Sequence, residues 1–153
     1  MNRQAAYDQL FRTLDALFAG ETDHISIMAT VSCELFHQFD HVHWVGFYRN
    51  TGGEVLKLGP YQGGHGCLTI SFDQGVCGQC AREKRLLNIP DVNAIPHHIA
   101  CSGSTRSEIV VPMLSTDEEL LFVLDLDSDL SAAFDEVDEL RLAQLNRYFL
   151  NSG

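Results

Sequence analysis

Runs with a two-residue side-chain period, each closed by turn residues, constrain the fold of this chain more than any other feature. The run HVHWVGFYRN (41–50) has this period, the turn Thr51-Gly52-Gly53 follows, and EVLKLGPY (54–61) returns. Successive side chains of a strand point to opposite faces, and a short glycine turn joins neighbouring strands, so a β-hairpin is predicted here. Further strands are predicted at CLTISF (67–72), LLNIP (86–90), SEIVVPML (107–114) and ELLFVLDLDS (119–128).

Helical periodicity flanks these strands at both ends of the sequence. Thr22 or Asp23 can cap the second of the helices, and Asp135 the last. A short polar helix is expected between Gly75 and Arg85, whereas residues 90–107 are expected to form a long irregular loop, which in a compact domain is usually functional or disordered. Three main helices are predicted, with apolar stripes that run over residues 7–18, 27–35 and 137–148.

These elements predict an α+β fold. The 153 residues are expected to form a single domain, residues 1–153. Its mainly antiparallel sheet is expected to have helices packed on one side and a loop-covered pocket on the other.

The charge of the chain excludes two classes of partner. A formal net charge of −11 leaves no basic surface for nucleic acid or for an anionic membrane. No apolar run approaches the length of a membrane span, and the first residues lack the apolar core of a signal peptide. We therefore expect a cytoplasmic protein with no nucleic-acid or membrane partner. In that compartment the five cysteines are expected to be buried side chains, metal ligands or redox-active thiols.

Acidic side chains gather on one face of the last predicted strand. Asp125 and Asp127 share a face with Leu121 and Val123, opposite the core face. Adjacent carboxylates on an apolar strand repel each other and lose solvation unless a cation or a proton lies between them. Alternatively, the end of this strand frays and both acids are hydrated; the pattern alone leaves both interpretations open.

Aromatic residues and a third acid complete the candidate pocket. Trp44 and Tyr48 lie on one face of their strand with Gly46 between them, which leaves a slot for a ligand or an approaching backbone. The alternative is that both rings belong to the core. If Glu108 faces the same side, the pocket suits a small zwitterion, whose ammonium group would meet carboxylates and rings.

The cysteines differ in their surroundings. Cys101 lies in the polar stretch HHIACSGSTRSE (97–108), which is typical of a reactive thiol, whereas Cys33 is expected to pack within a helix. Cys77 and Cys80 form a C-x-x-C motif, but no βαβ unit surrounds it, which argues against a thioredoxin-like pair. A zinc site is a lesser alternative, and Cys80 is expected on a buried helix face. The remaining zinc ligands would come from Cys67, Cys101, His65, His97 and His98.

Taken in order, several motifs resemble those of the free methionine-(R)-sulfoxide reductases, which are stand-alone GAF-domain proteins. The motifs are WVGFY, GPYQG, Cys67, GVCG, HIAC, SEIVVP and LDLDS, and the resemblance spans roughly residues 5–150. It implies a six-stranded antiparallel GAF sheet, often dimeric, and the reduction of free L-methionine-(R)-sulfoxide but not of the peptide-bound form.

The resemblance also implies roles for individual residues. Cys101 corresponds to the nucleophile, Cys67 to the resolving cysteine, and Cys77 to a third cysteine that can exchange disulfides. Ser102 stands where family members usually carry an acid. The remaining site residues would be pocket walls, Trp44 and Tyr48, and acids that hold the substrate and its sulfoxide oxygen, Glu108, Asp125 and Asp127.

The chemistry expected of such a site is thiol-based. The Cys101 thiolate would attack the sulfoxide sulfur, methionine would leave, and the resulting sulfenic acid would form a disulfide with a second cysteine. Thioredoxin would reduce that disulfide as an external reductant, so that no bound cofactor or metal is expected. The alternative is a non-catalytic GAF module that senses a small ligand or its own redox state.

Overall fold

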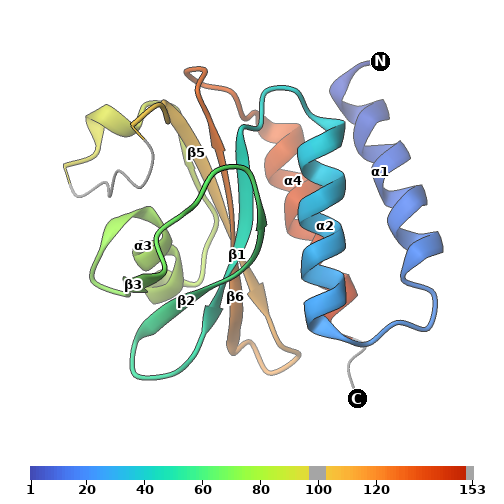
Figure 1. Cartoon of the computed structure of the whole chain (residues 1–153), viewed down its shortest axis with the longest axis horizontal. Coiled ribbons are helices and arrows are strands. Elements are labelled where there is room, and N and C mark those ends of the chain that lie inside the picture. Colours follow the sequence, from blue (N-terminus) through green and yellow to red (C-terminus); the bar gives the residue numbers. More distant parts are fainter. Residues whose placement is uncertain (97–102, 151–153) are drawn as a thin grey trace.

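The computed structural model of the chain describes residues 1–96 and 103–150. Its centre is one antiparallel sheet with the strand order β3-β2-β1-β6-β5-β4 (Figure 1). The predicted antiparallel sheet is confirmed. The strands are β1 (Trp44–Asn50), β2 (Val55–Gln62), β3 (Thr69–Ser71), β4 (Leu87–Ile89), β5 (Ser107–Leu114) and β6 (Leu120–Ser128). Both edge strands have only three residues, which limits the unpaired edge open to another chain.

Three helices form a layer on one face of the sheet, on the right in Figure 1. They are α1 (Arg3–Leu17), α2 (His24–Gln38) and α4 (Glu136–Gln144), and α4 continues into a 3-10 helix, Leu145–Phe149. Asp23 caps α2 and Asp135 caps α4, each through side-chain bonds to backbone N–H groups. Their apolar stripes meet Val45, Phe47 and Leu124 of the sheet in the larger core. Each fully buried side chain there contributes about 1.5–3 kcal/mol to folding.

The sheet face opposite this helix layer was expected to be covered by loops, but a helix also packs on it. The remaining α-helix, α3 (Gly75–Glu83), lies on this face beside β3 (Figure 1). It was expected to be polar, but Val76, Cys77, Cys80 and Ala81 are buried and join a second apolar cluster with the sheet. The apolar stripe explains the difference, because it docks α3 on the sheet instead of leaving it in solvent.

Two details of the predicted strand alternation are wrong. The two-residue period predicted over residues 41–50 would place Val42 on the face of Trp44, but β1 begins only at Trp44, and Val42 packs on the helix side. Leu121 was placed with Asp125, but it also packs on the helix side. A register shift between Met113 and Leu114, opposite the start of β6, interrupts the alternation there, as a β-bulge does.

A backbone hydrogen bond joins two described parts of the long segment before β5. A 3-10 helix, Val92–Ala94, interrupts the predicted irregular loop. The Val92 N–H donates to the carbonyl of Arg106 at 2.9 Å. This bond holds the backbone at residue 92 next to the backbone at residue 106, just before β5.

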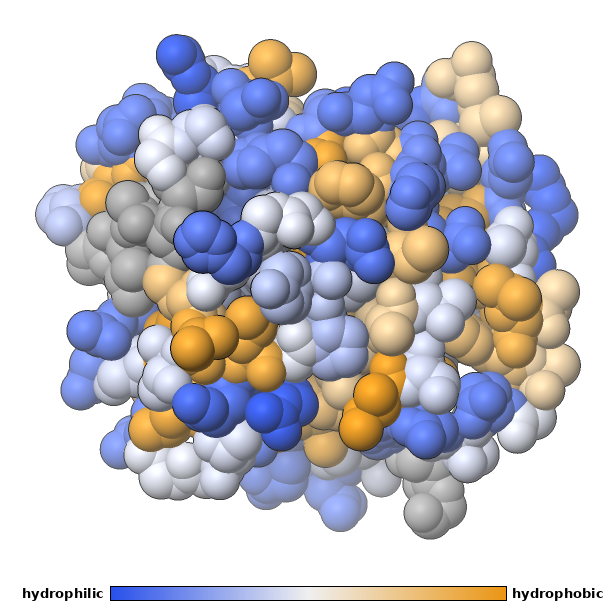
Figure 2. Space-filling view, in the orientation of Figure 1, coloured by the Kyte–Doolittle hydropathy of each residue, from blue (hydrophilic) through white to orange (hydrophobic). Residues whose placement is uncertain are grey.

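The surface mixes residue types. On the face shown in Figure 2, hydrophobic residues occur in small groups among hydrophilic ones. The exposed large hydrophobic side chains belong to different elements, and they include Leu17, Ile25, Leu68 and Leu140. Within residues 1–96 and 103–150, no helix combines the length and the apolar character needed to cross a bilayer.

Candidate active site

A pocket lies between α3 and the sheet face that the helix layer leaves open. The sequence predicted that aromatic and acidic side chains would converge on this side. The structure brings together in this pocket every predicted site residue that it describes except Cys67. These residues are Trp44 and Tyr48 on β1, Cys77 on α3, Glu108 on β5, and Asp125 and Asp127 on β6.

Strand register places the three acids. Asp127 lies between Glu108 on β5 and Trp44 on β1, and Asp125 lies one pleat away opposite Gly46. Asp125 is 5% exposed and Glu108 is 6% exposed. The hydrated-end interpretation therefore fails for Asp125, because β6 is paired on both sides through this region.

Burial and mutual repulsion change the ionisation of these acids. Burial raises the pKa of Asp125 well above its usual value, and the charges of Asp127 and Glu108 raise it further. Burial and Glu108 likewise raise the pKa of Asp127, and the carboxyl groups hydrogen-bond one another. Such bonds between carboxyl groups require a proton, so the cluster holds at least one near neutral pH. Among the described residues, Oδ1 of Asp125 is buried and has no hydrogen-bond partner.

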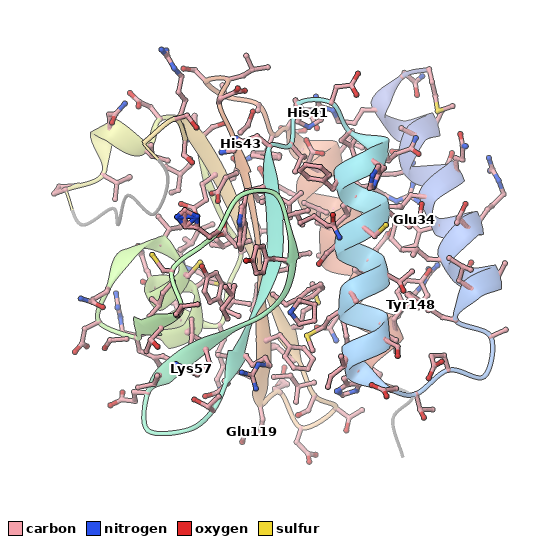
Figure 3. All side chains as sticks on the ribbon, viewed as in Figure 1. Glu34, His41, His43, Lys57, Glu119 and Tyr148 are labelled. Atoms are coloured by element: carbon pink, nitrogen blue, oxygen red, sulfur yellow. The ribbon has the colours of Figure 1, made fainter. Side chains whose placement is uncertain are left out.

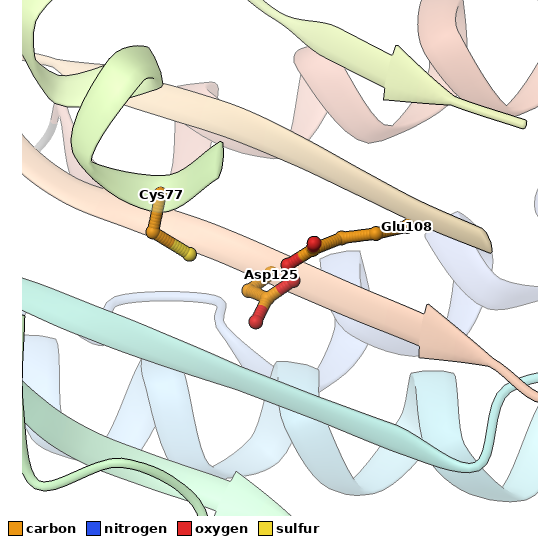
Figure 4. Close-up of side chains that lie close together, drawn as sticks. All are labelled: Cys77, Glu108 and Asp125. Atoms are coloured by element: carbon orange, nitrogen blue, oxygen red, sulfur yellow. The ribbon is translucent and has the colours of Figure 1, made fainter. Parts of the chain in front are cut away.

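A buried thiol also lines the pocket. Cys77 is 4% exposed, and its sulfur lies within 4.8 Å of carboxylate oxygens of Glu108 and Asp125 (Figure 4). Burial, followed by the charges of these acids, raises the pKa of the Cys77 thiol well above its usual value. Burial and Asp125 also raise the pKa of the Tyr48 phenol. Both groups are therefore neutral at physiological pH, and Cys77 is a poor nucleophile in this arrangement.

Stacked rings form one wall. The Trp44 ring stacks on Tyr48 at 6.1 Å and on Tyr61 at 5.4 Å between centroids, and its Nε1–H donates to the carbonyl of Gly64 at 2.8 Å. The slot expected at Gly46 is filled by the protein itself. An added Cβ there would lie 2.4 Å from Tyr61 Cβ and 2.7 Å from Trp44 Cη2, so the glycine makes room for these two side chains.

Comparisons with known proteins identify the family of the chain. The GAF domain family matches residues 22–146. The chain is 37% identical to the free methionine-R-sulfoxide reductase of Saccharomyces cerevisiae, over 95% of this chain and 84% of the yeast protein. It is also 37% identical to the Escherichia coli protein of the same name, over 95% of this chain and 87% of the other. The chain belongs to the free methionine-R-sulfoxide reductase family.

A solved structure of another family member is closely similar. The free methionine-R-sulfoxide reductase from Neisseria meningitidis, determined in complex with its substrate, superposes with a TM-score of 0.91 at 39% identity. The match covers 97% of this chain and 89% of the Neisseria chain. The GAF fold expected from the resemblance is thereby confirmed, and the chain is an oxidoreductase of this family.

The remaining cysteines of this family member occupy different environments. Cys67 is disulfide-bonded and packs, partly buried, against the pocket-side cluster. Cys33, Cys77 and Cys80 are free, and Cys80 is fully buried on α3, as expected. Cys101 lies outside the described residues. So do Ser102, His97 and His98.

Several lining residues were missed or considered only for zinc. Thr105 accepts or donates a 3.3 Å bond with Nε2 of His43, which lies just before β1 (Figure 3). Its place in the polar stretch before Glu108 was a signal that sequence reasoning could have used. His65, Gly66, Ile70 and Gln74 also line the pocket. They reach it from the β2–β3 connection, from β3 and from the start of α3, a convergence that no local spacing in the sequence reveals.

Proposed function

We propose that this protein reduces free L-methionine-(R)-sulfoxide to methionine by thiol chemistry. The observation that carries the proposal is a pocket in which three carboxyl groups, two stacked rings and a thiol converge. Membership of the reductase family supports the same substrate, since relatives at 37% identity bear that name.

The pocket has a complementary group for each part of this substrate. The ammonium group would be held by carboxylates and by the faces of Trp44 and Tyr48, as cations are at aromatic rings. The apolar side chain would lie along the same rings. A protonated acid, Asp125 or Asp127, would donate to the sulfoxide oxygen, since burial raises the pKa of both. That proton makes the sulfur electrophilic, which is general acid catalysis.

Reduction would begin at Cys101. Its thiolate attacks the sulfoxide sulfur, the oxygen is transferred to the cysteine sulfur, and methionine leaves with its sulfur reduced. The product on the protein is a sulfenic acid. The raised pKa of the Cys77 thiol argues against Cys77 as the attacking group, which favours Cys101 in that role.

Cys67 would resolve the sulfenic acid. Its thiol displaces water and forms the Cys67–Cys101 disulfide. The oxidised state of Cys67 and the free thiols of Cys33, Cys77 and Cys80 support this pairing. Cys77 would serve as a third thiol for disulfide exchange. Thioredoxin would restore the dithiol in the cytoplasm by attack on the disulfide, and we propose that the protein acts as a homodimer.

Turnover of purified protein with thioredoxin, thioredoxin reductase and NADPH tests the substrate. We expect methionine from the free R sulfoxide, little from the free S epimer, and little from an R sulfoxide within a peptide. Equal rates on the peptide would contradict the proposal. Binding of the free sulfoxide without release of methionine would instead support the non-catalytic GAF sensor.

Single-turnover release of methionine from pre-reduced protein separates the cysteines. Cys101→Ser should release none, whereas Cys67→Ser should release about one methionine per site and then stall as a sulfenic acid. Mass spectrometry of the trapped protein would identify that species. Cys33→Ser and Cys80→Ser are matched controls that should keep the full cycle. A methionine burst from Cys101→Ser would overturn the assignment of the nucleophile.

A further inference from the structure

Three potential metal ligands from three different elements meet at the floor of the pocket. The sulfur of Cys77 and carboxylate oxygens of Glu108 and Asp125 all lie within 4.8 Å of one another. Figure 4 shows them converging from α3, β5 and β6. All three side chains are more than nine-tenths buried, with 4%, 6% and 5% exposed. The thiol distinguishes this cluster from a group of acids alone.

A separate observation concerns the carboxyl group of Asp125. Oδ1 of Asp125 is buried without a hydrogen-bond partner among the described residues, and Asp125 lines the pocket. An unsatisfied oxygen of a buried carboxyl group is costly. A positively charged ligand placed between Asp125 and its neighbours would satisfy this oxygen and also reduce the repulsion within the cluster.

We propose that Cys77, Glu108 and Asp125 form a binding site for Zn²⁺, and that the metal competes with the substrate for the pocket. The competition rests on the proposed function, whereas binding of the metal does not. The zinc ion would be an inhibitor and not a cofactor, because it would occupy the carboxyl groups that otherwise hold the ammonium group and protonate the sulfoxide.

The geometry suits zinc after a small contraction. Zinc–sulfur bonds of about 2.3 Å and zinc–oxygen bonds of about 2.0–2.2 Å place tetrahedral ligand atoms about 3.3–3.8 Å apart. The present separations reach 4.8 Å, so the ligands would move inward by roughly 1 Å. The fourth ligand would be water or Asp127, which lies opposite Glu108 and hydrogen-bonds to it.

The donor set also selects among metals. A thiolate favours Zn²⁺ over Mg²⁺ or Ca²⁺, which prefer sites made of oxygen ligands alone. On binding, the sulfur–hydrogen bond of Cys77 breaks, a zinc–sulfur bond forms, and the proton goes to solvent together with protons from the carboxyl groups. No oxidation or reduction is involved.

This site differs from the zinc site that the C-x-x-C motif suggested. The motif would use Cys77 together with Cys80, but among the described residues Cys80 is not part of the ligand cluster. Cys33 provides a further contrast. Its sulfur lies 3.7 Å from Nδ1 of His37 on α2, so this pair could bind zinc weakly at the surface. Variants at these cysteines therefore separate the possible sites.

Titration of the reduced protein with Zn²⁺ against a competing chelator tests the proposal without turnover. We expect one tight ion per chain, and a thiolate-to-metal charge-transfer band when Co²⁺ replaces Zn²⁺. Cys77→Ser should remove the band and weaken Zn²⁺ binding on the order of 100-fold or more, since even outer-shell changes cost 10–100-fold. Glu108→Gln should weaken binding too. Cys80→Ser, Cys33→Ser and Cys101→Ser should each keep the tight site.

Three results of this titration would overturn the proposal. The ligand assignment is wrong if Cys77→Ser, shown to be folded by its thermal melt, binds Zn²⁺ as tightly as the parent. It is also wrong if Cys80→Ser, Cys33→Ser or Cys101→Ser abolishes the tight site. An excess of Mg²⁺ that displaced the ion would overturn the selectivity argument.

A competition experiment addresses the overlap with substrate. The Cys101→Ser protein is used because it is expected to bind the sulfoxide without consuming it. The apparent Kd for Zn²⁺ should rise in proportion to free methionine-(R)-sulfoxide, and an unchanged Kd with both ligands bound would overturn the overlap. If the sulfoxide does not bind at all, the proposed substrate is wrong, while the zinc titration still decides the metal site.

Discussion

Asp138 in the helix layer and Asp125 in the pocket are buried to a similar depth, 1% and 5% exposed, but their surroundings differ. The carboxylate of Asp138 accepts bonds from Arg3 at 2.7 Å, from the Tyr7 hydroxyl at 2.6 Å and from the Asp135 N–H at 2.8 Å. The neighbours of Asp125 are two further acids, and its Oδ1 has no partner among the described residues.

The difference separates an acid that the fold itself compensates from one that we propose to bind the substrate. Asp138 joins α1 to α4 and completes the capping box at the start of α4, so its charge is fully compensated within the fold. Asp125 is held by β6 in an environment that opposes its charge. A fold can tolerate this cost where a substrate or a proton supplies the missing partner, and such sites tend to trade stability for activity.

The largest effect should come from Asp125→Asn, which keeps the shape of the side chain but removes its proton. We expect turnover of the free R sulfoxide to fall about 10²–10⁴-fold, the usual contribution of a general acid. The assay is steady-state kinetics with thioredoxin, alongside thermal unfolding. Asp138→Asn is the matched control, and its turnover per folded molecule should be near that of the parent. Unchanged kinetics in Asp125→Asn would contradict the proposed difference in role between Asp125 and Asp138.

The free energy of unfolding should depend on Asp138, which turnover should not. Asp138→Asn loses charge-assisted bonds to Arg3 and Tyr7, so the free energy of unfolding should fall by about 1.5–3 kcal/mol. Urea denaturation measures this. Asp8→Asn neutralises the exposed acid of a pair with Arg141 at 2.8 Å and should cost only about 0–1 kcal/mol. Equal losses in the two variants would mean that the helix-layer network contributes no more than a surface ion pair.

The aromatic wall should be sensitive to a single methyl group. Gly46→Ala would force its Cβ against Tyr61 and Trp44, so we expect a loss of about 1–3 kcal/mol and a higher KM for the sulfoxide. Gly64→Ala is the control, because an added Cβ there meets nothing within 4 Å and the carbonyl that accepts from Trp44 remains. A harmless Gly46→Ala would show that the rings can move aside.

The smallest effect should be a change in the pH dependence of stability. Burial raises the folded-state pKa of Asp125 above the unfolded value of about 3.9. Between these two pKa values the folded protein binds more protons than the unfolded chain, so stability decreases as pH rises through that window. Asp125→Asn removes one such group. Its Tm relative to the parent should therefore increase as pH rises above about 4, and a constant or shrinking difference would argue against the raised pKa.

Periodicity in the sequence predicted the main helices and strands and most of the faces that they present. The alternation in β1 and β6 placed Trp44 with Tyr48 and Asp125 with Asp127 on common faces. Helical spacing predicted α1, α2 and α4, and the capping residues Asp23 and Asp135 were recognisable. These features follow from backbone geometry within a few residues, which the sequence encodes locally.

Contacts between elements were decided only by the tertiary structure. The pairing of β5 with β6 sets Glu108 opposite Asp127, and docking of α3 brings Cys77 to Asp125. Tyr61 reaches Gly46 because β2 pairs with β1 in one register. Each contact joins residues at least 15 positions apart, so it depends on strand register and on the packing of whole faces. No local spacing in the sequence specifies either of these.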